Sequence, residues 1–382
     1  MQPAFEIVEN LTRTEIGALW QALEAQAAPP FFLSWDWIGG WIETAAIQPA
    51  ILVGRCNASV VLLAAMMPAT RRSALRLPVH GLHLHATGAQ YHDIITVEYN
   101  GFMVATAWQG RIEAAALAFL LSGVVVADKR RDEVHLKTAS APIDRAMLES
   151  GMAFSEVQRK PSFRIDLAAI RASGKAYLDT LSANTRQQIR RSMRLYEKRG
   201  PLAARRAGSV EEALAWLDAL GVLHQQYWVA RGEPGAFAHP YFVAFQQHML
   251  RTGLARGVVE LLRISAGDAA IGYVYNFIYR GQVYAYLTGI SYEDDSKLKP
   301  GLVNHVLCIE AHLAEGGAVY DFMAGDNRYK ANLGEPGPEM FYCVAQRRTP
   351  TLWLENRLRR LKNHIDVWRK PNPADPHEQA PQ

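Results

Sequence analysis

The sequence predicts an α/β protein made of two similar halves. Between Gly281 and Glu335 the pattern is strand, loop, helix, strand, which is the order of a right-handed parallel crossover. An aromatic helix followed by two strands occurs twice, once from Ser34 and once from His239. With 382 residues, 49% of them hydrophobic, the chain is long enough for roughly two or three domains with large cores.

The elements of the first half follow one another without long gaps. SWDWIGGWIETA, from Ser34, predicts the aromatic helix, and PAILVGRCNASVVLLAAMMPA, from Pro49, predicts two strands joined by a turn. The apolar run 114–127 is shorter than the ~20 residues that span a bilayer, so we expect a buried helix there. The first residues carry acids instead of a basic segment before an apolar core, so we expect no targeting segment.

The halves are expected to meet within 151–161, where VQRKPS interrupts the pattern before the strand FRIDL. We therefore predict an amino-terminal half over 1–155 and a carboxyl-terminal half over 156–350. Residues 351–370 predict a basic amphipathic helix, because apolar side chains recur at helical spacing among basic ones. The segment 371–382 is Pro-rich and polar, and we expect it to be disordered.

The second half opens with a strongly basic helix that extends from Asn184 to Arg199. Arg186, Arg190 and Arg194 recur at four-residue steps and therefore project from one side. On that side they would meet a nucleotide phosphate or an anionic surface. The alternative is an ordinary solvated face, which is what most runs of like charge are.

The stretch after residue 281 has the layout of a phosphate site. Val283 to Ile290 alternates like a strand, and Pro300-Gly301 opens an amphipathic helix. The first turn of a helix offers unpaired N–H groups and partial positive charge, to which a glycine gives close access. The alternative is a common Pro-Gly helix start beside solvated lysines. The residues predicted to bind the cofactor are Lys299, Gly301, Leu302 and Val303.

Composition and missing motifs exclude several classes of function. A formal charge of +4 is too small to indicate nucleic-acid binding. The three cysteines lie far apart, which argues against disulfides or a zinc site and for a reducing cytoplasm. His80, His83 and His85 lack a further ligand at suitable spacing, so no metal is expected. Nucleophile elbow, dinucleotide, P-loop and zinc-protease motifs are absent from the sequence.

Five segments together carry a resemblance to a known family. They are ANTRQQIRRSMRLYEKRG, ARGEPGAFAHPYF, AIGYVYNFIYRGQVYAYLTG, the KPG helix start and YDFMAGDNRYK. From Tyr177 to Glu335 the sequence resembles the FemAB-like branch of the GNAT acyltransferase superfamily, in particular the CelD/BcsL-like group associated with cellulose and polysaccharide biosynthesis. One departure is that the usual Gln/Arg-x-x-Gly-x-Gly/Ala pyrophosphate loop is reduced to Lys-Pro-Gly.

This resemblance implies tandem GNAT-like folds, with mixed central sheets flanked by helices and a degenerate first half. It also implies that acyl-CoA is a co-substrate and that no cofactor stays bound. The expected reaction is transfer of an acyl group to a primary amine. A non-catalytic binding component of a polysaccharide or lipid assembly is the alternative from a different class.

Amine attack on a thioester needs a proton acceptor, a group that stabilises the oxyanion, and a partner for the thiolate. Asp326, Tyr329 and Lys330 follow a predicted central strand, where the crevice of such a sheet opens. We predict that Asp326 takes the amine proton, Lys330 stabilises the oxyanion or an acceptor phosphate, and Tyr329 serves the thiolate. The alternative is a turn at Asp326, with Lys330 extended toward solvent. Asp321, inside the strand, is interpreted as a structural carboxylate.

Four further residues are predicted to contact the substrate. We assign Tyr275, Tyr284 and Tyr286 to the acyl or acceptor channel, and Arg231, in the loop ARGEPGAFAHPYF, to substrate binding. The aromatic strands could equally be core.

Residues 351–370 would lie in a membrane interface or dock on their own domain. A helix that lies in the membrane interface favours a lipid-borne acceptor, namely a long-chain sphingoid-type base of bacterial ceramide synthesis, with an amino sugar as the alternative. It also predicts a cytoplasmic protein that is peripheral on the inner membrane face.

Overall fold

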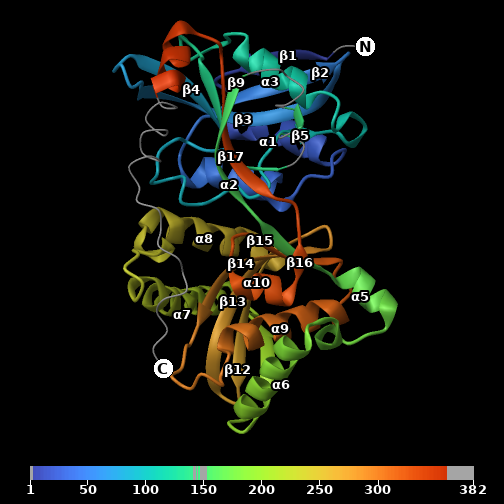
Figure 1. The fold of residues 1–382 in the computed structure, drawn as a ribbon. Helices are drawn as coiled ribbons and strands as arrows, with labels where there is room; N and C mark the ends of the chain where they lie inside the picture. The colour runs from blue at the N-terminus through green and yellow to red at the C-terminus, as the bar shows by residue number, and fades with distance from the viewer. Residues whose placement is uncertain (1–2, 141–142, 144, 147–152, 359–382) are drawn as a thin grey trace.

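The computed structural model describes residues 3–358 except 141–142, 144 and 147–152. Figure 1 shows two halves stacked end to end, each built on a sheet with helices against it. Residues 350–358 begin the predicted basic helix, while 359–370 and the segment 371–382 lie outside the described residues. Among the helices of the described ranges, none combines the length and apolarity needed to cross a membrane.

The amino-terminal half is built on one large sheet. Its strands, in spatial order, are β1 (Ala4–Val8), β2 (Ala50–Cys56), β3 (Ser59–Arg72), β4 (Pro78–Leu84), β8 (Glu133–Ala139), β17 (Met340–Gln346) and β9 (Ala153–Lys160), with β5 (Met103–Val104) paired to β3. The helical elements are α1 (Arg13–Glu24), η1 (Phe31–Leu33), α2 (Trp35–Thr44), η2 (Thr106–Trp108) and α3 (Glu113–Leu121). A small hairpin joins β6 (Val125–Val126) to β7 (Lys129–Arg130).

The carboxyl-terminal half is built on a second sheet. Its strands, in spatial order, are β11 (Leu202–Arg206), β12 (Val259–Ala266), β13 (Ala269–Tyr279), β14 (Gln282–Ile290), β15 (Val319–Ala324), β10 (Ser162–Asp166) and β16 (Glu335–Pro336). The helical elements are α5 (Leu167–Ser173), η3 (Tyr177–Thr180), α6 (Ala183–Glu197), α7 (Val210–Val229), η4 (Ala236–Ala238), α8 (Pro240–Gly253), η5 (Leu254–Arg256), α9 (Pro300–Ala314) and α10 (Arg328–Leu333).

The two sheets have the same pattern of strand pairing. From β1 to β4, and likewise from β11 to β14, every neighbouring pair is antiparallel. The next pair is parallel in both sheets, β4 with β8 and β14 with β15, and the last two pairs are antiparallel again. The parallel pair is joined through α9 in the second half, as the predicted crossover requires. The predicted tandem α/β architecture is confirmed.

The halves exchange strands at their boundary. The chain passes from β9 in the first sheet to β10 in the second, and it returns from β16 to β17 in the first. Figure 1 shows β17 running back into the amino-terminal half. Residues 340–346, which the predicted limits place in the carboxyl-terminal half, therefore complete the amino-terminal sheet. A pattern of local elements does not show such an exchange, because β-pairing between distant segments leaves no local trace.

Helix starts follow ordinary capping chemistry. Thr12 and Glu15 form a reciprocal capping box at α1, and serine side chains cap α2, α6 and α7. Like α3, α8 and α10, α9 has no side-chain cap among the described residues; its first turn begins after Lys299. Its N–H groups are therefore left for another partner.

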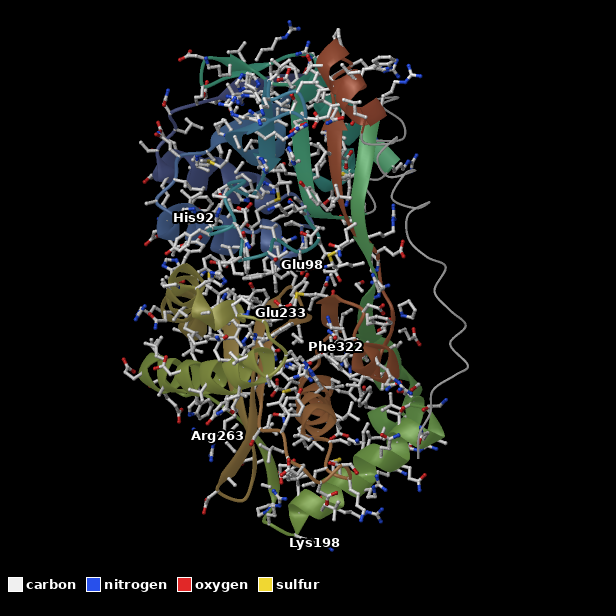
Figure 2. The ribbon with its side chains drawn as sticks, turned by 60° about the vertical axis from the view of Figure 1, so that its left-hand side comes forward. His92, Glu98, Lys198, Glu233, Arg263 and Phe322 are labelled. Atoms are coloured by element: carbon white, nitrogen blue, oxygen red, sulfur yellow. The ribbon has the colours of Figure 1, made fainter. Side chains whose placement is uncertain are left out.

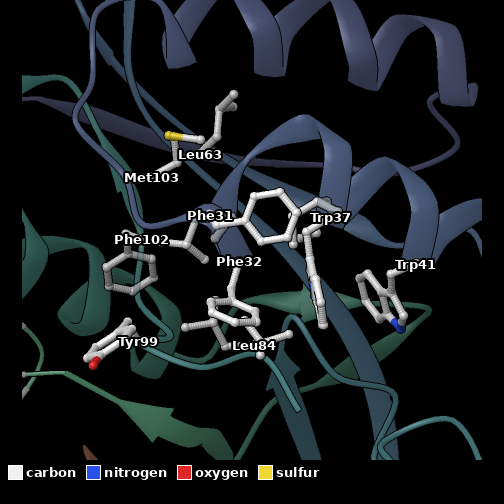
Figure 3. Packing of buried hydrophobic residues seen from close by; sticks show 14 of the residues in the cluster. Phe31, Phe32, Trp37, Trp41, Leu63, Leu84, Tyr99, Phe102 and Met103 are labelled. Carbon is white, nitrogen blue, oxygen red and sulfur yellow. The ribbon is translucent and has the colours of Figure 1, made fainter. Parts of the chain in front are cut away.

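One hydrophobic core joins the halves. Trp37, Phe31 and Phe32 of the first half are fully buried, and Figure 3 shows them packed together near Tyr99. Phe31 also stacks on Phe277 of β13, with ring centroids 4.5 Å apart. Because burial of each large side chain stabilises the fold by about 2–3 kcal/mol, this shared core holds the two sheets in a fixed relation.

Candidate active site

The site forms where two parallel strands separate. β14 and β15 are paired only from Gln282 with Val319 to Tyr284 with Asp321. Both strands continue beyond that point, to Ile290 and Ala324 respectively. Because no backbone pairing joins the later residues, the strands diverge toward their carboxyl ends and leave a gap in the sheet.

The gap widens into a cavity of about 700 Å³. Its walls come from both sides of the gap, from α7 and α9, and from a loop of the amino-terminal half. Lining residues include Thr96, Glu98, Leu223, Tyr227, Phe242, Tyr286, Leu287, Tyr292, Lys299, Gly301, Leu302, His305, Phe322, Met323, Tyr329 and Lys330. A volume of this size is in the range of small-molecule and cofactor sites.

The uncapped start of α9 forms one end of the cavity. Lys299, Gly301 and Leu302 all line it. A Cβ built on Gly301 would meet no atom within 4 Å, so the backbone there faces open space. Free N–H groups, the helix dipole and an adjacent lysine together favour an anion at this end.

A backbone distortion marks the inner end of β15. Met323 has a φ of 56°, a left-handed value that is unusual for a residue with a side chain. Its N–H donates to Asp321 Oδ1 at 2.7 Å, and the Tyr99 hydroxyl donates to both oxygens of the same carboxylate at 2.9 and 2.8 Å. Burial raises the pKa of Asp321 to about 6 in spite of these bonds. Asp321 is therefore a buried carboxylate that helps to hold a strained strand end against the first half.

Lys330 closes the inner end of the cavity from α10. Its ammonium group donates to the carbonyls of Phe322 and Ala324, both at 2.7 Å, and the residue as a whole is 7% exposed. Burial lowers the pKa of Lys330 to about 8, although the charges of Glu98 and Asp321 oppose that change. A cation that has lost most of its water lies directly on the cavity wall.

Glu98 reaches the same region from the amino-terminal half. Figure 2 shows it at the junction, facing the part of β15 that contains Phe322. One carboxylate oxygen, Oε2, is shielded from solvent and has no hydrogen-bond partner among the described residues. Burial raises the pKa of Glu98 to about 7, opposed by the Lys330 charge and by a hydrogen bond from the Ala324 N–H. Such a carboxylate can exchange a proton near neutral pH.

An aromatic pair completes this wall. The rings of His305 and Tyr329 stack with centroids 5.1 Å apart. Burial lowers the pKa of His305 to about 3, so the imidazole is neutral at physiological pH. Burial also raises the pKa of Tyr329 well above its usual range, so the phenol keeps its proton and can act as a hydrogen-bond donor.

The structure brings together six of the predicted site residues and places five elsewhere. Lys299, Gly301, Leu302, Tyr286, Tyr329 and Lys330 line the cavity. The other five are Asp326, Val303, Tyr275, Tyr284 and Arg231, none of which is on its wall.

Each residue outside the wall has a physical reason for its position. Asp326 is exposed on the loop after β15. Val303 faces the core between α9 and the sheet, and Tyr275 and Tyr284 are buried between the halves. The Arg231 guanidinium lies 3.5 Å from the centre of the Tyr227 ring on the exposed surface.

Sequence reasoning missed Glu98, which belongs to a loop without helical or strand periodicity. Its only signal was a carboxylate in an otherwise apolar stretch, DIITVEYNGF. Only the packing of the two halves against each other places Glu98 at the cavity.

The clustered histidines of the first half pack against neighbouring side chains. His83 stacks on His135 at 4.2 Å, and His85 Nδ1 lies 2.9 Å from Asn100 Oδ1, which gives each ring a packing role. In the described part of the chain, no group of three or more His, Cys, Asp or Glu side chains is arranged to hold a metal ion.

Comparison with known proteins gives one family match, within the second half. Residues 183–331 match the family described as Acetyltransferase (GNAT) domain. A search of curated proteins gives no significant match.

Several solved structures share the fold. FemX superposes with a TM-score of 0.55 at 11% identity, covering 88% of this chain and 96% of FemX. A domain from Agrobacterium fabrum assigned to a lysylphosphatidylglycerol synthetase gives 0.52 at 8% identity, covering 93% and 96%. L-PGS from Bacillus licheniformis gives 0.50 at 9% identity, covering 90% and 95%. At these identities the likeness shows the fold alone.

Residues 183–331 match the GNAT acetyltransferase domain, in the half for which the sequence resemblance predicted it, and FemX shares the fold of the two halves. The matched domain is the half that contains α9, the diverging strands and Lys330.

Proposed function

We propose that the protein transfers an acyl group from acyl-CoA to a primary amine. The observation that carries this proposal is the single cavity that joins an anion-binding helix start to a buried charged cluster through the gap between β14 and β15. A pyrophosphate at Gly301 and Lys299 would direct the pantetheine arm along the gap. The thioester would then lie beside Lys330 and Glu98.

The proposed chemistry uses the residues of the wall. The amine nitrogen attacks the thioester carbonyl carbon, and Lys330 stabilises the negative charge that develops on oxygen. The C–S bond breaks as the amide C–N bond forms, and Glu98 accepts the proton lost by the amine. Tyr329 donates a hydrogen bond to the leaving thiolate, and the proton that Glu98 took from the amine passes to the sulfur, so the products are the amide and the free thiol. Glu98 replaces Asp326 in this scheme because Asp326 is exposed and does not line the cavity.

For the acceptor, we favour a long-chain amine of the sphingoid-base type. The cavity wall opposite α9 is apolar and aromatic, with Leu223, Phe242 and Tyr286 along it, and Trp228 and Tyr292 are exposed at 38% and 59% among its lining residues. Such a surface suits an alkyl chain better than a sugar.

The tail helix gives no further support for this acceptor. Its first turns dock on the first half, because Leu352 is buried and Glu355 pairs with Arg71 at 2.9 Å. This docking fits the alternative reading of the predicted helix, as far as the described residues extend.

A thiol-release assay tests the proposal. The protein is mixed with acyl-CoAs of several lengths and with three acceptors: a long-chain amino alcohol, an amino sugar and a short soluble amine. We expect release of free thiol and an amide product, fastest with the long-chain amine. Preference for the amino sugar would select the polysaccharide alternative. Binding of acyl-CoA with no thiol release from any amine would indicate a non-catalytic binding protein.

A further inference from the structure

A second, smaller hollow adjoins the α9 end of the cavity. It has a volume of about 380 Å³ and is lined by Asn184, Gln187, Gln188, Arg191, Ser296 and Lys299. Ser296 and Lys299 also line the large cavity, so the two hollows are adjacent. The backbone N–H of Lys299 donates a hydrogen bond of 2.9 Å to Ser192 Oγ, which holds α6 beside the start of α9.

The four α6 residues in this hollow share one face of the helix. Positions 184, 187, 188 and 191 are spaced by three and four residues, which places them on one side. That side is polar, and its basic residue is Arg191. The arginine stripe that the sequence singled out lies on a different face, because Arg186 and Arg190 sit 3.9 and 3.0 Å from Asp179.

Arg191 differs from the neighbouring arginines of α6 and its C-terminal end in its ion pairing. Arg190 is neutralised by Asp179, and Arg199 by Glu293 at 2.7 Å. Within the described ranges, neither Arg191 nor Lys299 has a carboxylate partner. Two unpaired cations, with amide side chains between them, therefore face one polar hollow next to the predicted pyrophosphate position.

We infer that this hollow binds the 3′-phosphate of the coenzyme A nucleotide, with Arg191 and Lys299 as its cationic ligands. The inference rests on the proposed acyl-CoA donor and adds the residues that would distinguish coenzyme A from carriers without this phosphate. Coenzyme A carries its pyrophosphate and 3′-phosphate on the same ribose unit. A donor held at Gly301 therefore brings the 3′-phosphate within reach of the adjoining hollow. Guanidinium and ammonium groups are the usual protein partners of such a phosphate.

Matched donors test this site. Calorimetry compares a short-chain acyl-CoA with the same thioester of 3′-dephospho-CoA on the wild-type protein, Arg191→Ala and Arg190→Ala. We expect the wild type to bind the phosphorylated donor roughly tenfold to a hundredfold more tightly, from the strength of charge-assisted hydrogen bonds. Arg191→Ala should remove most of this preference, whereas Arg190→Ala, whose arginine is paired with Asp179, should keep it.

The possible failures are distinguishable. If the wild type binds both donors equally, the phosphate site is rejected while the acyl-CoA donor stands. The same conclusion follows if Arg191→Ala keeps the full preference. If neither donor binds the wild type, the proposed function fails and the site fails with it. Circular dichroism of each variant verifies folding, and Arg191→Glu provides a second variant that should bind the phosphorylated donor more weakly still.

Discussion

Replacement of Glu98 by glutamine removes a buried proton acceptor and keeps its size. The pKa of Glu98 is about 7 and that of Lys330 about 8, so in the wild type kcat/KM should rise about tenfold per pH unit below pH 7 and fall again above about pH 8, where Lys330 loses its charge. A general base supplies a factor of about 100 to 10,000, so Glu98→Gln should lower kcat by that range and lose the inflection near pH 7. Affinity for acyl-CoA should stay close to the wild-type value, because the anion-binding end of the cavity is untouched.

The same substitution should change how folding depends on pH. The pKa of Glu98 is about 7 in the folded chain and near the ordinary 4.5 when unfolded. Between pH 4.5 and pH 7 Glu98 keeps its proton in the folded chain and has lost it in the unfolded chain. The free energy of unfolding therefore decreases as pH rises from 4.5 to 7. At about 1.4 kcal/mol per unit of pKa, the whole effect is at most about 3.5 kcal/mol. Glu98→Gln should therefore gain stability over the wild type as pH increases from about 4.5 to 7.

The assays are steady-state thiol release and thermal unfolding, each measured from pH 5 to 9. Asp326→Asn is the matched control, since it removes an exposed carboxylate from the loop after β15. It should keep near-wild-type turnover. Wild-type activity and an unchanged pH profile in Glu98→Gln would refute the assignment of Glu98. Loss of turnover in Asp326→Asn with normal donor binding would return the role to Asp326.

Three further perturbations test other parts of the site. Gly301→Leu should fold, because a Cβ there meets no atom within 4 Å, and should weaken acyl-CoA binding in calorimetry by filling the anion site; unchanged affinity would reject that site. Lys330→Met should move the midpoint of the pH–rate profile above 7, because the lysine charge lowers the pKa of Glu98. An unmoved midpoint would show that the Lys330 charge does not affect the titration of Glu98. If the tail enters an anionic interface, the protein should sediment with acidic liposomes and be released by salt; reversal of Arg359, Arg360 and Lys362 to glutamate should abolish sedimentation, and absence of wild-type binding would contradict this reading.

Local pattern was sufficient for most elements of the fold. Alternation and the Pro-Gly start predict the crossover from β14 through α9 to β15, because each signal lies within the element it specifies. The repeated helix and strand pair likewise predicted the tandem halves. These are short-range properties of the chain.

The site depended on features that local pattern does not contain. β14 has a bulge, since Tyr275 pairs with Leu287 and the next residue, Asn276, pairs with Ala285. Tyr286 is the extra residue and lines the cavity, while Tyr284 is buried against Phe32, with ring centroids 5.5 Å apart. Alternation treats the two tyrosines as equivalent, and only the bulge separates their roles.

The position of Glu98 depends on contacts across the two halves. Tyr99, the next residue, hydrogen-bonds Asp321 of β15, a partner 222 positions away in the sequence. This contact anchors the loop that holds Glu98 beside Lys330. No spacing rule connects residues so far apart, so the sequence could indicate the lysine but not its carboxylate neighbour.

The exchanged strands also determine when the protein can finish folding during synthesis. β17 lies between β8 and β9 in the amino-terminal sheet, yet its residues, 340–346, are made only after those of the carboxyl-terminal sheet. Until then β8 and β9 each present an unpaired edge, the kind of surface that recruits other chains. Domains usually fold in the order in which they are made. Here the sheet of the first half is completed only after the second half has been made, so the order of folding differs from the order of synthesis.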